Sequence, residues 1–390
     1  MALIWTYKKF FSDTPLSKDG KPMPPMISCG FLETIKALTG SRAPSFMLEN
    51  CRGADNDIYQ YRITPYGVGL PHLVTIGDAE LAMAVLRDPK SLKPVIKNKV
   101  GKDQGAGNLL FSDGHRWRHA RRAVAPAFAS KHVSRMNVIV VKQVKTWINE
   151  TLIPKLVDKD ESFDVAQTFL HQILKGIAVA GMEYNMSDEE TEVFITEANI
   201  AMTELQAQMI NPVRRILSSF TPSGRRASLA KERMDQFVQN VLDNYRSLEN
   251  PQDDTVISAI VNNDAYLSDG ERLADIRIFF VAGFETTAYS LSWTLLELAK
   301  NPAEQTKVRN ALLSVPVNER RNVPELRNAI KEGMRLHPVS AGGIRRVLMK
   351  DFTTDKYFHQ KERLLLLELL PSIVIKSILT SQMSSGLRDG

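Results

Sequence analysis

The side chains best suited to chemistry lie in one apolar hexapeptide, Ala-Gly-Phe-Glu-Thr-Thr, in the second half of the chain. Ala282 and Thr286 are four residues apart, as are Gly283 and Thr287, so in a helix each pair shares one face. Small side chains at these positions would open a shallow groove with hydroxyl groups beside it. Glu285 places a carboxylate in the same apolar stretch, which is costly unless the group is paired or functional.

The hexapeptide lies within a stretch, Ile276 to Leu298, whose pattern predicts one long helix that is buried on most sides. A glycine inside a helix costs about 1 kcal/mol relative to alanine. Gly283 therefore indicates either close packing or room for a ligand. The alternative to a binding groove is a buried helix whose threonine hydroxyls bond back to the preceding turn, and the sequence leaves both open.

A second candidate is the pair Glu332 and Arg335, in a helix predicted from Val323 to Leu336. Pro324 suits the first turn of that helix, and Pro338 ends it. Residues three apart can pair on one face, which contributes a few tenths of a kcal/mol when the pair is exposed. Because chance supplies many Glu-x-x-Arg spacings, this pair gains meaning only from its neighbours.

The third candidate combines Trp117 and Arg121, which have the i, i+4 spacing that places one above the other on a helix. An indole N–H and a guanidinium can both donate hydrogen bonds to one anionic group. The alternative is a solvated basic face, since Arg116, Arg118 and Arg122 lie in the same segment.

In their order along the chain, these motifs resemble those of the haem-thiolate monooxygenases, the cytochrome P450 family. Leu336-His337-Pro338 directly after the Glu-x-x-Arg pair strengthens the resemblance, which runs from about Leu48 to Asp351. It implies a mainly α, cytochrome P450-like helical fold with a small N-terminal β part, and a haem cofactor.

The resemblance assigns a role to each candidate residue. Thr286 would steady bound oxygen and Glu285 would supply protons as the catalytic pair, with Ala282 and Gly283 lying over the haem. Three side chains would bind the haem propionates: Trp117, Arg121 and Arg346, the last five residues before Asp351. Glu332 and Arg335 would form a buried structural pair beneath the haem.

One part of the family's site is absent from this sequence. The family's iron ligand is a cysteine near the C-terminus, in a loop of the form Phe-x-x-Gly-x-Arg-x-Cys-x-Gly. The cysteines of this chain are Cys29 and Cys51, far upstream of the hexapeptide. We therefore expect no metal ligand here, and a family member that is C-terminally altered or truncated, with the haem-loop region missing.

Composition limits the partners and the compartment. A net charge of +6 permits an acidic protein or an anionic membrane surface as partner, but is too small to indicate nucleic acid. Two cysteines provide no disulfide framework, which favours a reducing, intracellular compartment. The densest apolar stretch, Leu364 to Leu379, is interrupted by Glu368, Pro371 and Lys376. A membrane span needs about 20 mostly apolar residues, so a soluble or peripherally membrane-associated protein is expected.

The resemblance implies three segments: residues 1–47 with a Pro-rich linker at Lys21–Pro25, a cytochrome P450-like domain at 48–351 that is incomplete, and a divergent tail at 352–390. Strands are predicted between Ile58 and Ile76, and Asp78 suits the N-cap of a helix through Leu86. Helical periodicity marks five further segments: Gly114–Phe128, Arg135–Leu156, Val165–Met182, Asp188–Leu217 and Ser228–Leu248.

The function implied by the resemblance is oxidation of a small organic substrate, with molecular oxygen and electrons from a reductase that docks on a basic face. Because a thiolate on the iron favours O–O cleavage, the chain is expected to be inactive as it stands. The alternative is a non-catalytic helical scaffold with a binding or regulatory role.

Overall fold

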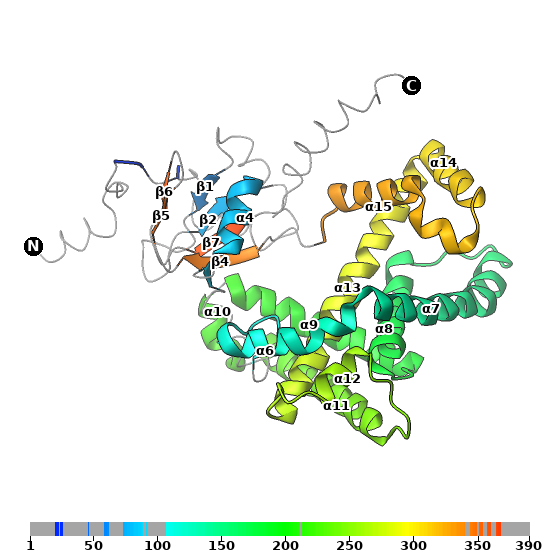
Figure 1. Ribbon diagram of the computed structural model, residues 1–390, viewed down its shortest axis with the longest axis horizontal. Helices are drawn as coiled ribbons and strands as arrows, with labels where there is room; N and C mark the ends of the chain where they lie inside the picture. Colours follow the sequence, from blue (N-terminus) through cyan, green and yellow to red (C-terminus); the bar gives the residue numbers. More distant parts are fainter. Residues whose placement is uncertain are drawn as a thin grey trace, which may run out of the picture. The chain divides into compact units, whose positions relative to one another are not determined.

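Two units make up the chain in the computed structural model (Figure 1): residues 1–95 together with 340–390, and residues 96–339. The structure describes residues 20–22, 24–25, 46, 58–61, 73–88, 91–92, 107–210, 212–339, 344–348, 351–353, 357–359 and 364–367.

The first unit contains a five-stranded sheet in the order β1-β2-β7-β4-β3, and a separate β5-β6 pair. Its elements are β1 Ile58–Tyr61, β2 Leu73–Ile76, α4 Ala79–Arg87, β3 Ser91–Leu92, β4 Ile344–Leu348, β5 Phe352–Thr353, β6 Phe358–His359 and β7 Leu364–Leu367. β2 and β7 are parallel, whereas the pairs β1-β2, β4-β7 and β3-β4 are antiparallel. The sequence correctly predicts strands between Ile58 and Ile76, and a helix capped by the Asp78 side chain, which accepts a hydrogen bond from Leu81 N at 2.7 Å.

The sheet is not built from the N-terminal segment alone. β7, the run of four leucines at Leu364–Leu367, lies in its centre and pairs with β2 on one side and β4 on the other. An unbroken apolar run is typical of a strand with neighbours on both sides. Residues from the predicted tail thus complete the sheet that the N-terminal strands begin.

The Pro-rich segment is attached to this sheet. The carbonyl of Pro24 accepts a hydrogen bond from Gln60 Nε2 at 2.6 Å, and that of Pro25 accepts one from Gln60 N at 2.9 Å. Pro24 is buried. These two bonds dock the segment against β1.

The second unit is helical and confirms the prediction of a mainly α fold. Its α-helices are α6 Gly114–Val124, α7 Ser130–Trp147, α8 Val165–Met182, α9 Asp188–Ile210, α10 Pro212–Leu217, α11 Pro222–Ser247, α12 Val256–Val261, α13 Asp269–Lys300, α14 Pro302–Leu313 and α15 Pro324–Leu336. Short 3-10 or π-helical turns are Ala125–Phe128, Ile148–Val157, Ser218–Phe220 and Val317–Asn322.

The predicted helix bounds differ from the observed ones where capping was overlooked. α11 begins at Pro222, six residues before the predicted start, because the Thr221 side chain accepts a hydrogen bond from Gly224 N at 3.1 Å. Proline at a first helical position costs no hydrogen bond. α8, by contrast, has the predicted bounds, since Asp164 caps it by accepting from Gln167 N.

α13 is the longest helix and contributes to the main core of this unit. Phe280 and Phe284 on α13 are fully buried and meet Phe194 of α9, with ring centroids 5.6 Å and 6.2 Å apart. Aromatic pairs at such distances add attraction beyond their buried area. This packing fixes one face of α13 and leaves the opposite face for other contacts.

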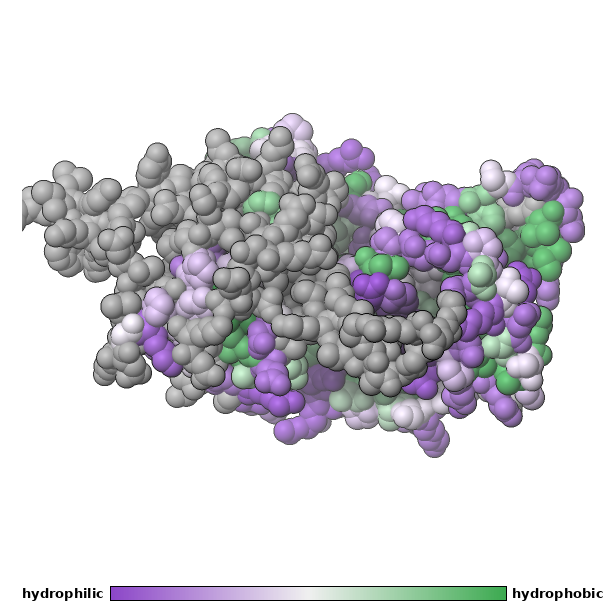
Figure 2. All heavy atoms as spheres, turned by 90° about the horizontal axis from the view of Figure 1, so that it is seen from above, coloured by the Kyte–Doolittle hydropathy of each residue, from purple (hydrophilic) through white to green (hydrophobic). Residues whose placement is uncertain are grey.

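The described surface carries hydrophilic and hydrophobic side chains intermixed, as the view in Figure 2 shows for one side. Single exposed apolar side chains are normal in folded proteins. In the described parts of the chain, no helix has both the length and the apolar character needed to cross a membrane.

Candidate functional site

The hexapeptide forms one and a half turns in the middle of α13, with one side buried and the other open. Phe284 is buried, whereas Ala282, Thr286 and Thr287 are exposed. The Thr286 hydroxyl donates a hydrogen bond to the carbonyl oxygen of Ala282 at 2.9 Å. The expectation of burial on most sides is therefore wrong for this turn, and the hydroxyl makes the back-bond of the alternative interpretation.

Gly283 packs closely against a neighbouring helix. A Cβ atom built at Gly283 would lie 2.8 Å from Cδ1 of Ile177 on α8, so the flexible end of that side chain would have to shift to admit it. Of the two reasons that the sequence left open for this glycine, close packing is the one that the structure supplies.

Glu285 is half-buried beside these residues on α13. Burial raises the pKa of its carboxyl group above the usual value. Among the described residues its carboxylate has no hydrogen bond and no ion pair. The nearby carboxylate also contributes, after burial, to a raised pKa of Tyr289, one turn further along. Glu285 thus retains a proton to higher pH than an exposed glutamate does.

Trp117 and Arg121 lie one turn apart on the exposed side of α6, whose inner side is made by Ala120 and Val124. Trp117 is 37% exposed, so its ring is accessible from outside the helix bundle. Arg118 and Arg122 are exposed as well, which agrees with a basic face. Both interpretations of the sequence, an anion-binding pair and a solvated basic face, are compatible with this arrangement.

Arg346 lies on β4 in the other unit, opposite Leu365 of β7. Its side chain is partly buried. The convergence of Arg346 with Trp117 and Arg121 on one anionic group stays a prediction.

Glu332 and Arg335 form a two-pronged ion pair on α15. Arg335 Nε donates to Glu332 Oε2 at 2.7 Å, and its NH2 group donates to Oε1 at 2.6 Å. The bonds to Arg335 are the main cause of a lowered pKa of Glu332. However, the Glu332 side chain is 52% exposed, so the expectation of a buried pair is wrong for the glutamate. Residues one turn apart pair without needing a core around them.

The neighbouring residue Gly333 is the buried one, and it meets Thr294 of α13. One turn further, the ring of His337 stacks on Trp293 with centroids 4.0 Å apart and planes at 9°. His337 Nε2 also lies 3.0 Å from Glu297 Oε1. The motif around Glu332 is thus attached to α13 through its glycine and its histidine.

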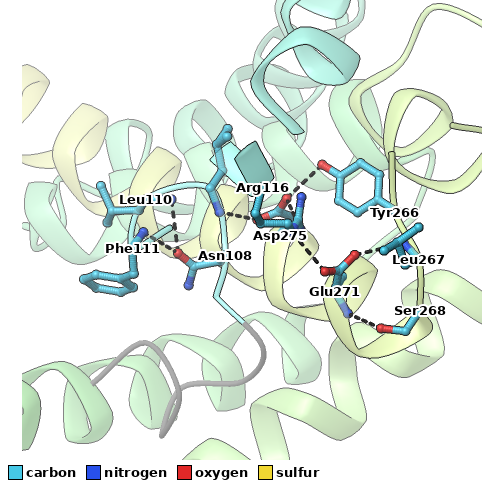
Figure 3. A network of polar contacts seen from close by, with 10 residues as sticks. Asn108, Leu110, Phe111, Arg116, Tyr266, Leu267, Ser268, Glu271 and Asp275 are labelled. Atoms are coloured by element: carbon cyan, nitrogen blue, oxygen red, sulfur yellow. Dashed lines mark hydrogen bonds and ion pairs between the residues drawn. The ribbon is translucent and has the colours of Figure 1, made fainter. Parts of the chain in front are cut away.

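A buried aspartate that the sequence reasoning missed lies near the start of α13. Figure 3 shows Asp275 surrounded by Tyr266, Arg116 and the backbone turn before α6. Its side chain is fully buried. The signal was present, since Asp275 is a carboxylate between Ala274 and Ile276, as Glu285 is within its own apolar stretch.

A groove of about 250 Å³ lies between α9 and α11, and Phe194, which lines it, also meets Phe284 of the hexapeptide. Two of its lining carboxylates, Glu190 and Glu197, are already bonded. Glu190 accepts from Tyr184 and from Ser187 N, and Glu197 is paired with Arg233. These two carboxylates are therefore satisfied within the protein and do not point to a ligand.

The chemistry of the candidate side chains on α6 and α13 suits the periphery of a haem site, since indole, guanidinium and hydroxyl groups can all form hydrogen bonds. Trp117 and Arg121 lie on the exposed side of α6, and Ala282 and Thr286 lie on the exposed side of α13. In the described parts of the chain, no cluster of three histidine, cysteine or acidic side chains could hold a metal ion. Cys29 and Cys51 lie outside the described residues.

Comparison with known proteins agrees with these features. The family described as cytochrome P450 matches residues 59–370. Cytochrome P450 monooxygenase claQ from Ampulloclitocybe clavipes is 26% identical over 62% of this chain and 50% of its own length. Cytochrome P450 monooxygenase 205 from Postia placenta is 25% identical over 72% of this chain and 58% of its own length. Taurochenodeoxycholic 6 alpha-hydroxylase from Sus scrofa is 23% identical over 69% of this chain and 58% of its own length.

The chain spans about half the length of the curated relatives that it matches. The family match covers most of the chain, including α6, α13, α15 and the sheet strands from β1 to β7. Haem is the cofactor of this family, and monooxygenation is its reaction. The chain belongs to the cytochrome P450 family.

Proposed function

We propose that this chain carries the helical side of a monooxygenase site that oxidises a small organic substrate with O2 and electrons from a reductase. We further propose that the 390-residue chain is inactive because it makes no thiolate–iron bond. The observation that carries the first part is the central turn of α13, where half-buried Glu285 adjoins the exposed side of Ala282 and Thr286.

Four groups would take part, two on this turn of α13 and two on α6. The Thr286 hydroxyl donates a hydrogen bond to the Ala282 carbonyl, so the lone pairs of the hydroxyl oxygen can accept a hydrogen bond from another group. The Glu285 carboxyl, with its raised pKa, can hold a proton and pass it to an acceptor beside α13. On α6, the Trp117 indole and the Arg121 guanidinium would bind carboxylates by charge-assisted hydrogen bonds.

Haem, when bound, supplies the redox-active iron at which oxygen is activated. In this family the reactivity of that iron depends on a thiolate ligand. Both cysteines of the chain, Cys29 and Cys51, precede α6 and α13 in the sequence, whereas the family's ligand follows them. No catalytic step is therefore assigned to the 390-residue chain.

The reductase would meet the basic side of α6. Arg118 and Arg122 are exposed there beside Arg121. Complementary charge raises association rates more than it raises affinity, and salt screens it. An acidic surface on the reductase is the partner chemistry that fits this face.

Haem titration tests the proposed site. The wild-type chain and the variants Arg121→Ala and Trp117→Phe are titrated with haem, and binding is followed by absorbance. Arg122→Ala is the matched control, since it removes the same charge one position away on the same helix. We expect weaker binding for Arg121→Ala and Trp117→Phe than for Arg122→Ala. Equal affinities in all four proteins would contradict the assignment.

A second candidate, a non-catalytic helical scaffold, is favoured by one set of contacts. Gly283 packs on Ile177, Gly333 packs on Thr294, and the Thr286 hydroxyl bonds to its own helix, so helix packing alone accounts for all three.

Thermal melting without haem separates the two candidates. The enzyme by descent is expected to be marginally stable and prone to association in the absence of haem. A monodisperse monomer with a sharp melt above about 60 °C, beyond most of the mesophile range, would favour the scaffold.

A further inference from the structure

Asp275 on α13 receives hydrogen bonds from separate parts of the chain. Leu109 N donates to its Oδ1 at 2.5 Å, and the Tyr266 hydroxyl donates to its Oδ2 at 2.8 Å. An NH2 group of Arg116, on α6, lies 3.4 Å from the same Oδ2. Figure 3 shows Arg116 and Tyr266 pointing toward the carboxylate of Asp275. One side chain thus connects α13 to the turn before α6, to α6 itself and to the segment before α13.

The carboxylate is fully buried, and its surroundings act on its pKa in two opposing directions. Burial raises the pKa of Asp275, while the Leu109 N–H, the Tyr266 hydroxyl and Arg116 oppose that rise. A buried acceptor that loses its donors is far more costly than an exposed one. The bonds to Asp275 therefore fix the positions of Leu109 N, the Tyr266 hydroxyl and the Arg116 guanidinium.

Arg116 is fixed by contacts on several sides. Its Nε lies 3.1 Å from Glu271 Oε1, and its guanidinium carbon lies 4.9 Å from the centroid of the Tyr266 ring. Glu271 Oε2 also accepts a hydrogen bond from Leu267 N at 2.9 Å, and the Ser268 hydroxyl accepts one from Glu271 N. The same glutamate thus organises the start of α13 and holds the first turn of α6.

The turn before α6 is also held by hydrogen bonds among its own residues. The side-chain oxygen of buried Asn108 accepts hydrogen bonds from Leu110 N and Phe111 N, both at 3.1 Å. Its carbonyl accepts from Phe111 N and Ser112 N. A turn that is bonded internally transmits the position of Leu109 to the helix that follows at Gly114.

We propose that Asp275 is a positioning residue, which fixes the start of α6 on α13 and thereby sets where Trp117 and Arg121 stand. The second half of this statement rests on the proposed function, in which those two side chains bind the haem propionates. Trp117 directly follows Arg116, and Arg121 is one turn further on, so a shift of the first turn displaces both. α13 carries Asp275 ten residues before Glu285. The same helix would therefore position Trp117 and Arg121 through Asp275, and would carry Glu285 itself.

The test compares amide hydrogen exchange in four haem-free proteins: wild type, Asp275→Asn, Tyr266→Phe and Glu204→Gln. Tyr266→Phe is the milder variant, which removes one donor and retains the aspartate. Glu204→Gln is the matched control, because Glu204 is also a buried carboxylate, bonded to Arg214 and Gln208 on the α9–α10 side. Haem affinity is then measured for the same proteins and for Arg121→Ala.

We expect Asp275→Asn to raise exchange of the amides in residues 109–124 about tenfold more than exchange in α8, with a smaller effect in Tyr266→Phe. Glu204→Gln should show no such selectivity. A uniform rise in both regions, or no rise at 109–124, would overturn the proposal, since Asp275 would then act on global stability or not at all.

The haem arm separates this proposal from the proposed function. If Asp275→Asn and Arg121→Ala both weaken haem binding, with selective exchange, both proposals are supported. If Arg121→Ala weakens binding and Asp275→Asn does not, the positioning of Trp117 and Arg121 by Asp275 is wrong. If neither weakens binding while exchange at 109–124 is selectively raised, the joint between α6 and α13 is supported and the haem assignment fails.

Discussion

Gly333 of α15 approaches Thr294 of α13 so closely that a Cβ atom at position 333 would lie 2.5 Å from the threonine hydroxyl oxygen. It would also lie 3.1 Å from the Cα atom of Thr294. The hydroxyl itself donates to the Ser290 carbonyl at 2.7 Å, so it is not free to turn away. The glycine between Glu332 and Met334 is therefore a contact point between two helices that carry separate motifs of the family.

Gly333→Ala should destabilise the helical unit, whereas Gly283→Ala should be nearly neutral. Both substitutions gain about 1 kcal/mol of helix propensity, but overpacking costs about 1–3 kcal/mol where the neighbour cannot move. At position 333 the obstacle includes backbone, and at position 283 it is the flexible end of Ile177. Denaturant unfolding of both variants measures the difference.

Thr294→Ala provides the control for this prediction. The double variant with Gly333→Ala should be less destabilised than the sum of the two single variants, since the hydroxyl oxygen is gone. Strict additivity, or a Gly283→Ala variant as unstable as Gly333→Ala, would contradict the packing account.

Glu285 should make stability fall as pH rises. Its pKa is raised by burial in the folded state, so the folded protein binds the proton more tightly than the unfolded chain does. The resulting stabilisation is complete below the unfolded pKa of about 4.3, and is lost as pH rises through the raised folded pKa. Thermal melts of wild type and Glu285→Gln across this window are the measurement. The variant should lack this component, and identical pH profiles would show that the carboxyl group titrates normally.

Sequence patterns located β1, β2, α4 and most of the longer helices, because local signals act there without competition. The bounds of α8 and the start of α4 follow from their aspartate caps, and the α6, α13 and α15 motifs lie on helices as expected. What could not be read from the sequence depends on distant packing. Which face of α13 is exposed is decided by the aromatic residues of α9 and by Ile177, far away in sequence.

The burial of individual charges was the weakest part of the prediction, for the same reason. The sequence predicts a buried Glu332, whose side chain is half-exposed, and gives no comparable prediction for Asp275, whose side chain is fully buried. The sequence shows on which face of a helix a carboxylate lies, but the solvent exposure of that carboxylate is set by other elements that pack against the helix.

Glu332→Gln should change the unfolding free energy of the haem-free chain by no more than about 1 kcal/mol. An exposed ion pair contributes about 0–1 kcal/mol, and the Glu332 side chain is 52% exposed. A double-mutant cycle with Arg335→Lys, followed by denaturant unfolding, measures the pair. A coupling energy above about 2 kcal/mol would mean that the pair is covered in solution by residues beyond its own helix.

His337→Ala should weaken the attachment of α15 to α13. The substitution removes the stacking on Trp293 and the contact with Glu297, together on the order of 1–2 kcal/mol. His337→Phe is the matched variant, because it retains an aromatic ring and removes the polar contact. Trp293 fluorescence and unfolding together report the effect, and a fully neutral His337→Ala would contradict the role assigned to this contact.

The absorption spectrum of the reduced, carbon-monoxide-bound protein tests the central claim most directly. The 390-residue chain is supplied with haem, reduced and exposed to carbon monoxide. We predict no Soret band at the thiolate position, because both cysteines precede the helices of the site in the sequence. A histidine-type band would agree with haem bound on this scaffold without the family's ligand. A thiolate-type band would contradict the claim and assign the iron to Cys29 or Cys51.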